Sequence, residues 1–271
     1  MDSQTYRLGF IGAGKLAGSV IRGLVRAKFC EPREMIASEP SEDAQAALKK
    51  DVDLAFTAEN AEVAEKADVI FVAVKPGVVL KVLRELAPKI DNKLVISLAA
   101  GVELKAMEAV ANARFMRGMT NTPSAICRAA TGITRGTRTT NEDVDLARKI
   151  FESIGIVVEV TELQIHGVTA LSGSGPAFIY TIIEWLAQGG EKVMLPADIA
   201  LKLATQTVLG AAQLAHESGL SPEELRRQVV TPGGTTAAGL AIMDQLRTRQ
   251  GIIEAVNAAT ARAIMMARDN K

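Results

Sequence analysis

The stretch GFIGAGKLA, residues 9–17, decides the fold of the first half of the chain. It joins the end of a β-rich run to a helix predicted at 15–28, with the pattern G-x-G-x-x-A between them. In such a turn Gly12 permits the sharp bend, Gly14 lets a ligand approach the backbone, and Ala17 allows close packing of helix on strand. Free N–H groups at the helix start suit phosphates. The pattern predicts a dinucleotide-binding turn, and a tight turn without a ligand is the alternative.

Strands and helices alternate through the first 160 residues. Val69–Val74 is apolar on both faces, which is typical of a central parallel strand. The other predicted strands are 7–12, 35–38, 94–97, 114–119, 131–135 and 156–160, and the other helices are 44–50, 78–90, 104–110 and 142–153. This alternation favours right-handed crossovers and a doubly wound, mostly parallel α/β sheet, the Rossmann fold.

From about residue 164 the sequence predicts helices alone, at 176–192, 197–216, 222–230, 236–246 and 252–268. The helix at 197–216 is apolar nearly all round, whereas a surface helix of a monomer usually has one apolar stripe. Burial within its own bundle is one explanation, and we favour cover by a second copy in an interlocked homodimer. We expect a dinucleotide-binding domain at residues 1–162 and an all-helical dimerisation and substrate-binding domain at 163–271.

Composition narrows the classes of partner. The 271 residues carry 31 basic and 31 acidic side chains and 4% aromatics, which is unlike a nucleic-acid-binding surface. Cys30 and Cys127 suit free thiols in a reduced compartment, and His166 and His216 lack ligand spacing, so we expect no metal. Residues 1–6 show no secretory leader and the apolar runs are too short for a membrane span. We expect a soluble, cytoplasmic protein that acts on a small molecule.

Other candidate residues follow the ends of strands, where open α/β sheets bind ligands. Lys75, in AVKP at 73–76, is placed to face a cofactor, although a solvated lysine is the alternative. The small residues of SLAAG at 97–101 would admit a flat ring, and MTNTP at 119–123 suits a carboxamide or the substrate; both are also compatible with ordinary loops.

Ser38 and Glu39 follow the strand that should meet the adenosine ribose. An inward Glu39 would favour the 2′-hydroxyl of NAD and repel the 2′-phosphate of NADP, whereas Ser38 suits either coenzyme. An outward Glu39 would be a solvated loop charge, and the sequence leaves both orientations open.

Two turns of the helical half, LSGSGPA at 171–177 and TPGGTT at 231–236, offer free N–H groups and hydroxyls at helix starts. They suit a small carboxylate, with capped interhelical turns as the alternative. The sequence has no recognisable Ser–His–Asp set or carboxylate pair. Hydride addition to an already protonated C=N bond needs little proton transfer from the protein, so this type of reaction fits.

Together the motifs resemble the pyrroline-5-carboxylate reductases, from Leu8 to about Arg268. The matching segments are GFIGAGKLA, AVKP, AAGV, MTNTP, LSGSGPAF, LAQGG, LPADIA, TVLGAA and TPGGTTAAG. The resemblance implies a Rossmann domain followed by an all-α dimerisation domain, and in many members a decamer, a ring of five dimers. It implies hydride transfer from NADPH or NADH to L-1-pyrroline-5-carboxylate, giving L-proline in the last step of proline biosynthesis.

The resemblance also implies roles for single residues. Cofactor-binding residues would be Ile11, Gly12, Ala13, Gly14, Lys15, Leu16, Ser38, Glu39, Asn60, Ala73, Val74, Lys75, Pro76, Ala99, Ala100, Gly101 and Asn121. Substrate-binding residues would be Thr231, Gly233, Gly234, Thr235 and Thr236. Thr236, whose hydroxyl would hydrogen-bond the ring nitrogen, and Lys75 would be the catalytic residues, and the substrate loop would reach the cofactor of the partner chain. Glu39 stands where serine is common in the family.

Two other functions remain as alternatives. A related imine reductase or 3-hydroxyacid dehydrogenase would use a similar scaffold, but the hydroxyacid enzyme needs a lysine early in the first long C-terminal helix, and Lys192 lies at its far end. A redox sensor that only binds a dinucleotide would not need the turn at 231–236.

Overall fold

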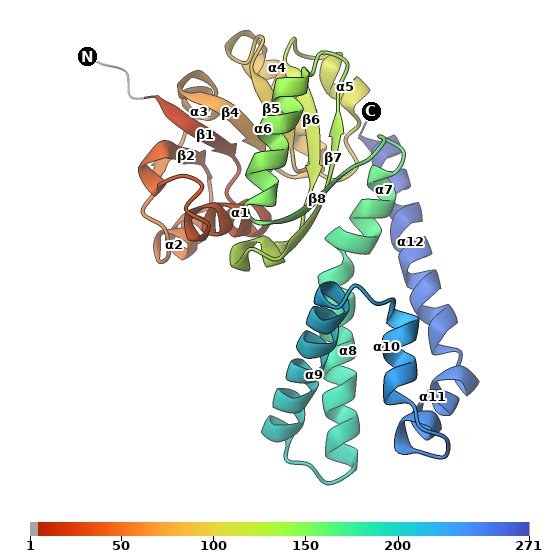
Figure 1. Cartoon of the computed structure of the whole chain (residues 1–271). Helices are drawn as coiled ribbons and strands as arrows, with labels where there is room; N and C mark the ends of the chain where they lie inside the picture. The colour runs from red at the N-terminus through yellow and green to blue at the C-terminus, as the bar shows by residue number, and fades with distance from the viewer. Residues whose placement is uncertain (1–4, 271) are drawn as a thin grey trace. The chain divides into compact units, whose positions relative to one another are not determined.

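The computed structural model describes residues 5–270, so residues 1–4, on which part of the leader expectation rests, lie outside it. The chain divides into two compact units. We call residues up to Ser174 together with those from Ala258 onward the sheet unit, and Gly175–Asn257 the helical unit. Figure 1 labels the elements of both.

The sheet unit contains one eight-stranded sheet with the order β3-β2-β1-β4-β5-β6-β7-β8. The strands are β1 (Tyr6–Ile11), β2 (Met35–Ser38), β3 (Ala55–Thr57), β4 (Ala67–Val72), β5 (Leu94–Ser97), β6 (Arg114–Met119), β7 (Ala129–Arg135) and β8 (Gly155–Glu159). All neighbours run parallel except β6 and β7. Because the chain moves outward from β1 to β3 and then returns to β4, the strand order reverses between β1 and β4, which confirms the Rossmann prediction.

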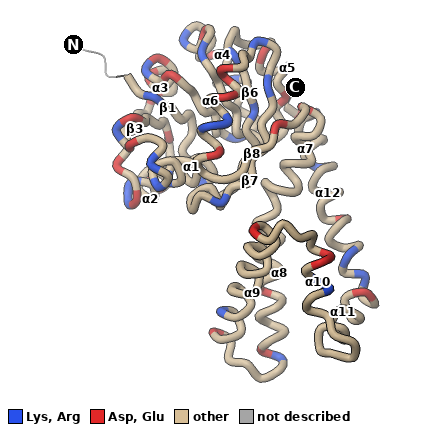
Figure 2. Tube along the Cα trace, in the orientation of Figure 1, with Lys and Arg blue, Asp and Glu red and all other residues tan. Residues whose placement is uncertain are grey.

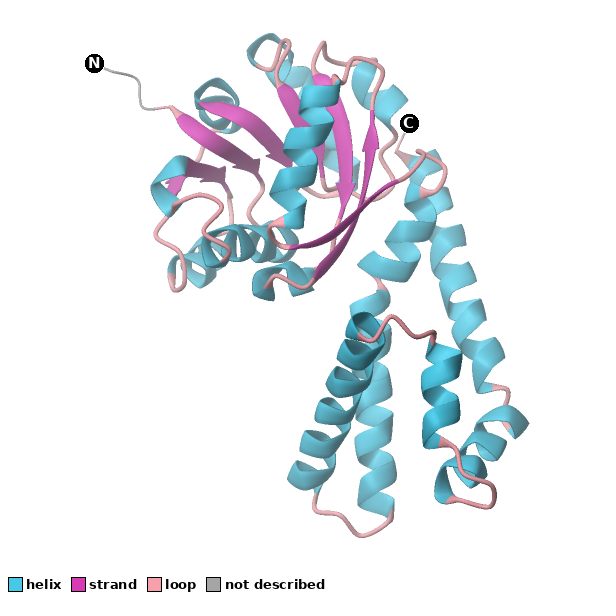
Figure 3. Ribbon diagram, viewed as in Figure 1, coloured by secondary structure: helices cyan, strands magenta, loops and turns pink. Residues whose placement is uncertain are grey.

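Helices cover both faces of this sheet (Figures 1 and 3). They are α1 (Lys15–Arg26), α2 (Glu42–Lys49), α3 (Asn60–Lys66), α4 (Pro76–Leu86), α5 (Leu104–Glu108) and α6 (Asn141–Glu152), with short 3-10 turns η1 (Pro32–Glu34), η2 (Ala87–Lys89) and η3 (Thr122–Ile126). Strand β4 divides its side chains between the two faces: Phe71 packs with α1 and α6, and Ile70 packs with α3, α4 and α5. The double-sided apolar pattern of this strand is therefore confirmed.

Two parts of the sheet unit differ from the prediction. Strand β3 and helix α3 were not predicted from the sequence. The segment at 171–177 is not a turn, because α7 (Ile165–Val168) continues into a π-helix, η4 (Thr169–Gly173), and then into α8. Ser174 N donates to Thr169 O (2.9 Å) and the Ser172 hydroxyl donates to Ala130 O. These groups are used within the fold, so this segment is not the open anion-binding turn that we expected.

The helical unit contains α8 (Gly175–Lys192), α9 (Ala197–Glu217), α10 (Pro222–Val229), α11 (Thr235–Gln245) and the first part of α12 (Thr248–Asp269), as predicted. In its described residues the buried apolar cluster consists of three alanines, Ala187, Ala200 and Ala204. Much larger side chains are exposed, including Trp185 at 64% and Leu203 at 53%. Figure 2 shows long uncharged stretches of α8 and α9. The helical unit therefore lacks an apolar core of ordinary size within one chain.

The expected domain boundary at 162 follows the last strand, since β8 ends at Glu159. The compact units divide later, after Ser174, because α7 and η4 pack with the sheet and the end of α12 contacts the loop at Gly101. The boundary of the functional domains stays a prediction. Among the described residues, none of the helices combines the length and the apolar character required to cross a bilayer.

Candidate functional site

The loops that follow four strands of the sheet are joined into one edge by backbone hydrogen bonds. The bonds are Gly12 N to Ser38 O, Ala73 N to Ile11 O and Leu98 N to Val72 O, at 2.8, 2.8 and 2.9 Å. Residues that the sequence assigned to a cofactor after β1, β2, β4 and β5 therefore lie along the carboxyl edge of neighbouring strands. This edge includes the point between β1 and β4 at which strand order reverses, where doubly wound sheets bind ligands.

The glycine turn after β1 has the shape that a pyrophosphate requires. Gly12 has φ +89°, and a Cβ at this position would lie 3.0 Å from the carbonyl carbon and oxygen of Ala73, so only glycine fits without strain. Around Gly14, by contrast, the space is open to at least 4 Å. Within the described chain no side chain caps the start of α1, so its first N–H groups remain available to an anion. These residues fit the diphosphate of a dinucleotide.

A cavity of about 410 Å³ opens beside this turn, between the starts of α1 and α2. Its walls include Ala13, Gly14 and Lys15 from the first segment and Ser41 and Asp43 from the second. The ammonium group of Lys15 belongs to an exposed side chain, so it adds a positive charge at the rim. The cavity provides space for part of a nucleotide next to the available N–H groups.

Glu39 is turned towards the glycine turn. Its Oε2 accepts a hydrogen bond from Ala13 N (2.9 Å) and its Oε1 accepts one from Ser41 N (3.0 Å). Of the two orientations that the sequence left open, the structure therefore has the inward one. Beside it, buried Ser38 donates through its hydroxyl to Asn60 Oδ1 (2.6 Å), so these two candidates also meet.

The remaining cofactor candidates line the loops after β4 and β5. Val74 and Lys75 lie between β4 and α4, and the exposed Lys75 immediately precedes Pro76, the first residue of that helix. The loop Ala99–Gly101 lies between β5 and α5 and packs on the end of α12. Each segment is where the sequence expectation put it, after the end of its strand.

Asn121 is the candidate whose surroundings differ most from the expectation. Its side chain is buried, with Nδ2 donating to Ser172 O (3.1 Å) and Oδ1 accepting from Ala130 N (3.2 Å). Both ends of the amide thus connect backbone segments. A role for Asn121 in binding the cofactor stays a prediction.

Sequence reasoning missed Arg117, which contacts the Ala99–Gly101 loop, and Glu162, which accepts a hydrogen bond from Leu104 N just after the loop. Arg117 is fully buried on β6 and pairs with Glu162 (3.0 Å). A charged residue inside a predicted strand was the available signal for Arg117. Nothing in the local sequence marks Glu162.

The candidate substrate residues gather in the helical unit, at the start of α11. Gly234 N donates to Thr231 O (3.0 Å), which closes the turn, and Gly233 has φ +70°. Gly234 is the N-cap of α11, and a Cβ there would lie 2.3 Å from the Thr231 hydroxyl oxygen. Thr235 and Thr236 follow in the first helical turn. The arrangement places the N–H groups of a helix start beside hydroxyl groups, which suits a carboxylate.

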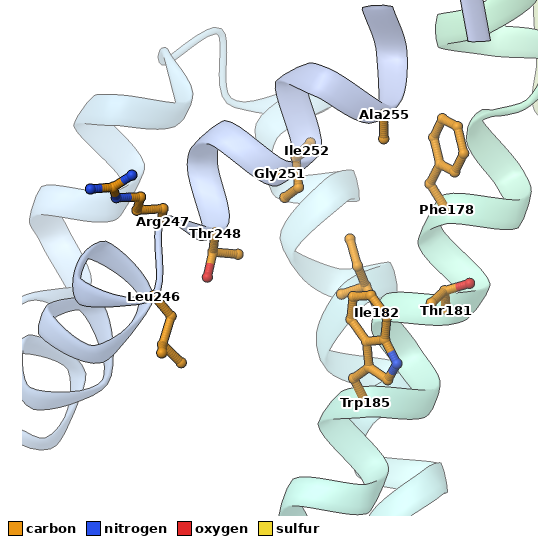
Figure 4. Close-up of a pocket in the computed structure, with 10 residues that line it drawn as sticks. All are labelled: Phe178, Thr181, Ile182, Trp185, Leu246, Arg247, Thr248, Gly251, Ile252 and Ala255. Atoms are coloured by element: carbon orange, nitrogen blue, oxygen red, sulfur yellow. The ribbon is translucent and has the colours of Figure 1, made fainter. Parts of the chain in front are cut away.

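The helical unit also contains an apolar cavity of about 420 Å³ between α8 on one side and the first turns of α12, with the two residues before them, on the other (Figure 4). Phe178, Ile182 and Trp185 contribute from α8, and Leu246 and Ile252 from the opposite side. Leu246 is 72% exposed. No group of three or more His, Cys, Asp or Glu side chains in the described residues could hold a metal ion, and Cys30 and Cys127 are free thiols.

Comparison with known proteins extends to both halves of the chain. Residues 162–266 match the family described as pyrroline-5-carboxylate reductase dimerisation. Residues 7–101, which contain the glycine turn and the loops after β4 and β5, match the family described as NADP oxidoreductase, coenzyme F420-dependent.

The similar proteins match over almost their whole length. A pyrroline-5-carboxylate reductase of Pisum sativum is 40% identical, with 96% of each chain covered, and one of Synechocystis is 39% identical, covering 95% of this chain and 97% of the relative. Among solved structures, the reductase from Coxiella burnetii is 35% identical with a TM-score of 0.87, and that of Plasmodium falciparum, with NADP bound, is 28% identical with a TM-score of 0.89. Each covers 97% of this chain and 99% of the solved chain. The chain therefore belongs to the pyrroline-5-carboxylate reductase family.

Proposed function

We propose that this chain reduces L-1-pyrroline-5-carboxylate to L-proline, the last step of proline biosynthesis, with a nicotinamide coenzyme as the hydride donor. The observation that carries the proposal is the match to pyrroline-5-carboxylate reductases over nearly the whole chain, 40% identical to the Pisum sativum protein. The open glycine turn after β1 supports it independently, because its backbone fits a dinucleotide. The chain is thus an NAD(P)H-dependent oxidoreductase that acts on a cyclic C=N bond.

The sheet unit binds the coenzyme. Ile11–Leu16 form the turn that holds the diphosphate, through the uncapped backbone N–H groups at the start of α1, and Ala73–Pro76 and Ala99–Gly101 line the remaining length of the site. Lys75 adds a positive charge beside the negatively charged ligand. When bound, the reduced nicotinamide supplies a hydride to the carbon of the C=N bond.

The turn before α11 binds the imino acid. Backbone N–H groups at Gly233–Thr236 grip its carboxylate, favoured by the positive end of the helix dipole. The Thr236 hydroxyl hydrogen-bonds the ring nitrogen and orients it. Because the imine is already protonated, this chain needs to supply position and electrostatic preorganisation rather than a strong acid.

The coenzyme that we propose as preferred is NADH. The support is the carboxylate of Glu39, which hydrogen-bonds Ala13 N at the glycine turn. A carboxylate at the end of the second strand accepts hydrogen bonds from ribose hydroxyls, and it repels a 2′-phosphate. The Plasmodium falciparum relative was solved with NADP, so this chain would differ from it in preference.

The chain is a homo-oligomer, and we take the basic assembly to be a dimer in which helices of one copy cover the exposed apolar helices of the other. The family match at 162–266 and the small alanine cluster of the helical unit support this assembly. In it, the substrate turn of one chain serves the coenzyme of its partner, and five dimers form a ring. The free thiols Cys30 and Cys127 fit the reduced cytoplasm, the proposed compartment.

The proposed dimer can be tested by introducing a charged residue into the apolar cavity. Leu246→Glu should convert the purified protein to monomers in analytical ultracentrifugation, because the partner's apolar side chains would then meet a carboxylate. Lys192→Glu, which introduces a carboxylate at another exposed residue, the last of α8, is the control. If the Leu246→Glu protein dimerises with unchanged affinity, the cavity does not lie in the dimer interface.

Turnover tests the function directly. The purified chain should oxidise NADH or NADPH when L-1-pyrroline-5-carboxylate is added, and should reduce NAD⁺ or NADP⁺ with L-proline at alkaline pH. Coenzyme binding without either reaction would support the redox sensor. Turnover of a 3-hydroxy acid but not of proline would support the hydroxyacid dehydrogenase.

A further inference from the structure

The loop Ala99–Gly101, which follows β5, is held at Ala99, at Gly101 and, just beyond it, at Leu104 by groups that the sequence did not assign to any site. We propose that the fully buried Arg117, its ion-pair partner Glu162 and Asn270 are positioning residues, which fix this loop where it receives the nicotinamide end of the coenzyme. The proposal rests on the proposed function in one respect, that the ligand of the sheet edge is a nicotinamide dinucleotide.

Arg117 provides the first anchor. Its guanidinium is fully buried on β6, beside Ser97 of β5, and donates through Nη1 to Glu162 Oε1 (3.0 Å) and through Nη2 to Ala99 O (3.4 Å). Its Nε is buried without a partner in the described chain. Burying a charge in this way costs stability even when it is paired, so the ion pair is better explained by the loop that it holds than by a gain in stability.

Glu162 provides the second anchor, at the other end of the same segment. Its Oε1 accepts from Arg117 and also from Leu104 N (3.0 Å), the first residue of α5. The ion pair therefore holds residue 99 through its carbonyl and residue 104 through its N–H group. His166 lies nearby on α7, where burial and the charge of Arg117 lower its pKa.

Asn270 provides the third anchor, at Gly101, the last residue of the loop. Its Nδ2 donates to Gly101 O (3.2 Å) and to Met266 O (2.7 Å), which joins the loop to the end of α12. Gly101 has φ +67°, and a Cβ there would lie 2.7 Å from the Met266 Cβ, so the backbone itself is packed against the helix.

These anchors matter because the loop has no large side chain that could fix its position by packing. Ala99, Ala100 and Gly101 have no side chain beyond a methyl group, so the position of the loop depends on its backbone contacts. Hydride transfer requires reacting atoms held within a few tenths of an ångström, and a shift of about 1 Å can cost roughly 100-fold in rate. Because the residues of the loop are small, the nicotinamide ring can approach its backbone closely. The three anchoring side chains then determine the distance between the ring and the backbone.

The test separates the nicotinamide end from the adenosine end of the ligand. Titration calorimetry measures the Kd of NADH, the coenzyme proposed as preferred, and of ADP-ribose, which has the same adenosine and diphosphate but no nicotinamide. Glu162→Gln keeps an acceptor oxygen but removes the charge opposite Arg117, and Asn270→Ala removes the donor to Gly101 O. We expect each to weaken coenzyme binding roughly 3- to 10-fold, about the worth of one hydrogen bond.

The matched control is Asp143→Asn, which perturbs a second ion pair of β6, Arg114 Nε to Asp143 Oδ2 (2.8 Å). This pair does not touch the loop. We expect ADP-ribose binding to stay within about twofold of wild type in all three variants, and coenzyme binding to stay so in the control. Asn270→Gln, which retains the donor amide, should recover part of the loss.

Three results would overturn the proposal: unchanged coenzyme binding in both test variants, an equal loss of coenzyme and ADP-ribose, or the same loss of coenzyme binding in the control. If Glu162→Gln does not fold, Asn270→Ala at the end of α12 decides alone. A wild-type chain that binds neither reduced coenzyme would instead refute the proposed function, before any variant is compared.

Discussion

Replacing Glu39 by glutamine is expected to shift the coenzyme preference towards NADPH. The carboxylate is fixed at the glycine turn, because its two oxygens accept from Ala13 N (2.9 Å) and Ser41 N (3.0 Å). Two unit charges about 4 Å apart repel by ~1 kcal/mol in water and ~4 kcal/mol near a protein surface. An intermediate repulsion of about 2 kcal/mol corresponds to roughly 30-fold in the ratio of kcat/KM for the two coenzymes.

The assay compares kcat/KM for NADH and NADPH at saturating substrate. Glu39→Gln keeps an oxygen that can accept from Ala13 N, so it isolates the charge, whereas Glu39→Ser also removes the acceptor and should weaken NADH further. Glu42→Gln removes one exposed carboxylate from the first turn of α2 and is the control. The reasoning is refuted if Glu39→Gln leaves the ratio unchanged, or if the control moves it equally.

Three further predictions follow from the same structure. Thr236→Ala should lower kcat/KM for the imino acid roughly 10- to 100-fold, the loss of one oriented hydrogen bond to the charged ring nitrogen, and steady-state kinetics equal to wild type would contradict its role. Gly12→Ala should destabilise folding by about 1–3 kcal/mol in urea titration and abolish measurable coenzyme binding, because the Cβ would crowd Ala73 at a positive φ; binding at wild-type affinity would argue against the turn as the diphosphate site. Burial and the charge of Arg117 hold the pKa of His166 in the folded chain below its ordinary value of 6.5. Just below pH 6.5 the unfolded chain therefore binds a proton at this side chain more readily than the folded chain does. Stability should therefore fall from about pH 6.5 downwards until the folded pKa is passed, and His166→Gln should flatten the Tm profile in that window; an equally steep profile would contradict this.

Local signals predicted most of the fold. Strands β2, β5 and β6 occupy the residues predicted for them, because β-branched and apolar runs between helical segments are a strong signal. Strand β3 and helix α3 were missed because elements of three and seven residues are too short to establish a periodicity. The segment 171–177 was misjudged because its glycines and serines are typical of a turn, whereas tertiary hydrogen bonds such as that of Ser172 keep it helical.

The candidate site, like the fold, contains features that the sequence predicts and features that it does not. The glycine turn could be predicted because its strand, turn and helix are adjacent in sequence. The inward orientation of Glu39 could not, because its partner Ala13 lies 26 residues earlier. The Arg117–Glu162 pair joins residues 45 apart, and only the folded sheet brings both to the loop at Ala99. Sequence patterns therefore identify where a ligand binds, and tertiary contacts determine which ligand and how firmly.

The three-alanine cluster of the helical unit has a consequence for how the protein is made. A newly synthesised chain can complete its sheet unit alone, but the leucines of α9 find too little apolar surface within the same molecule. Maturation of this half is then a second-order event, faster where many sister chains are produced together and reversed by dilution. Solitary chains would expose α9 to proteases and to aggregation until a sister chain arrives.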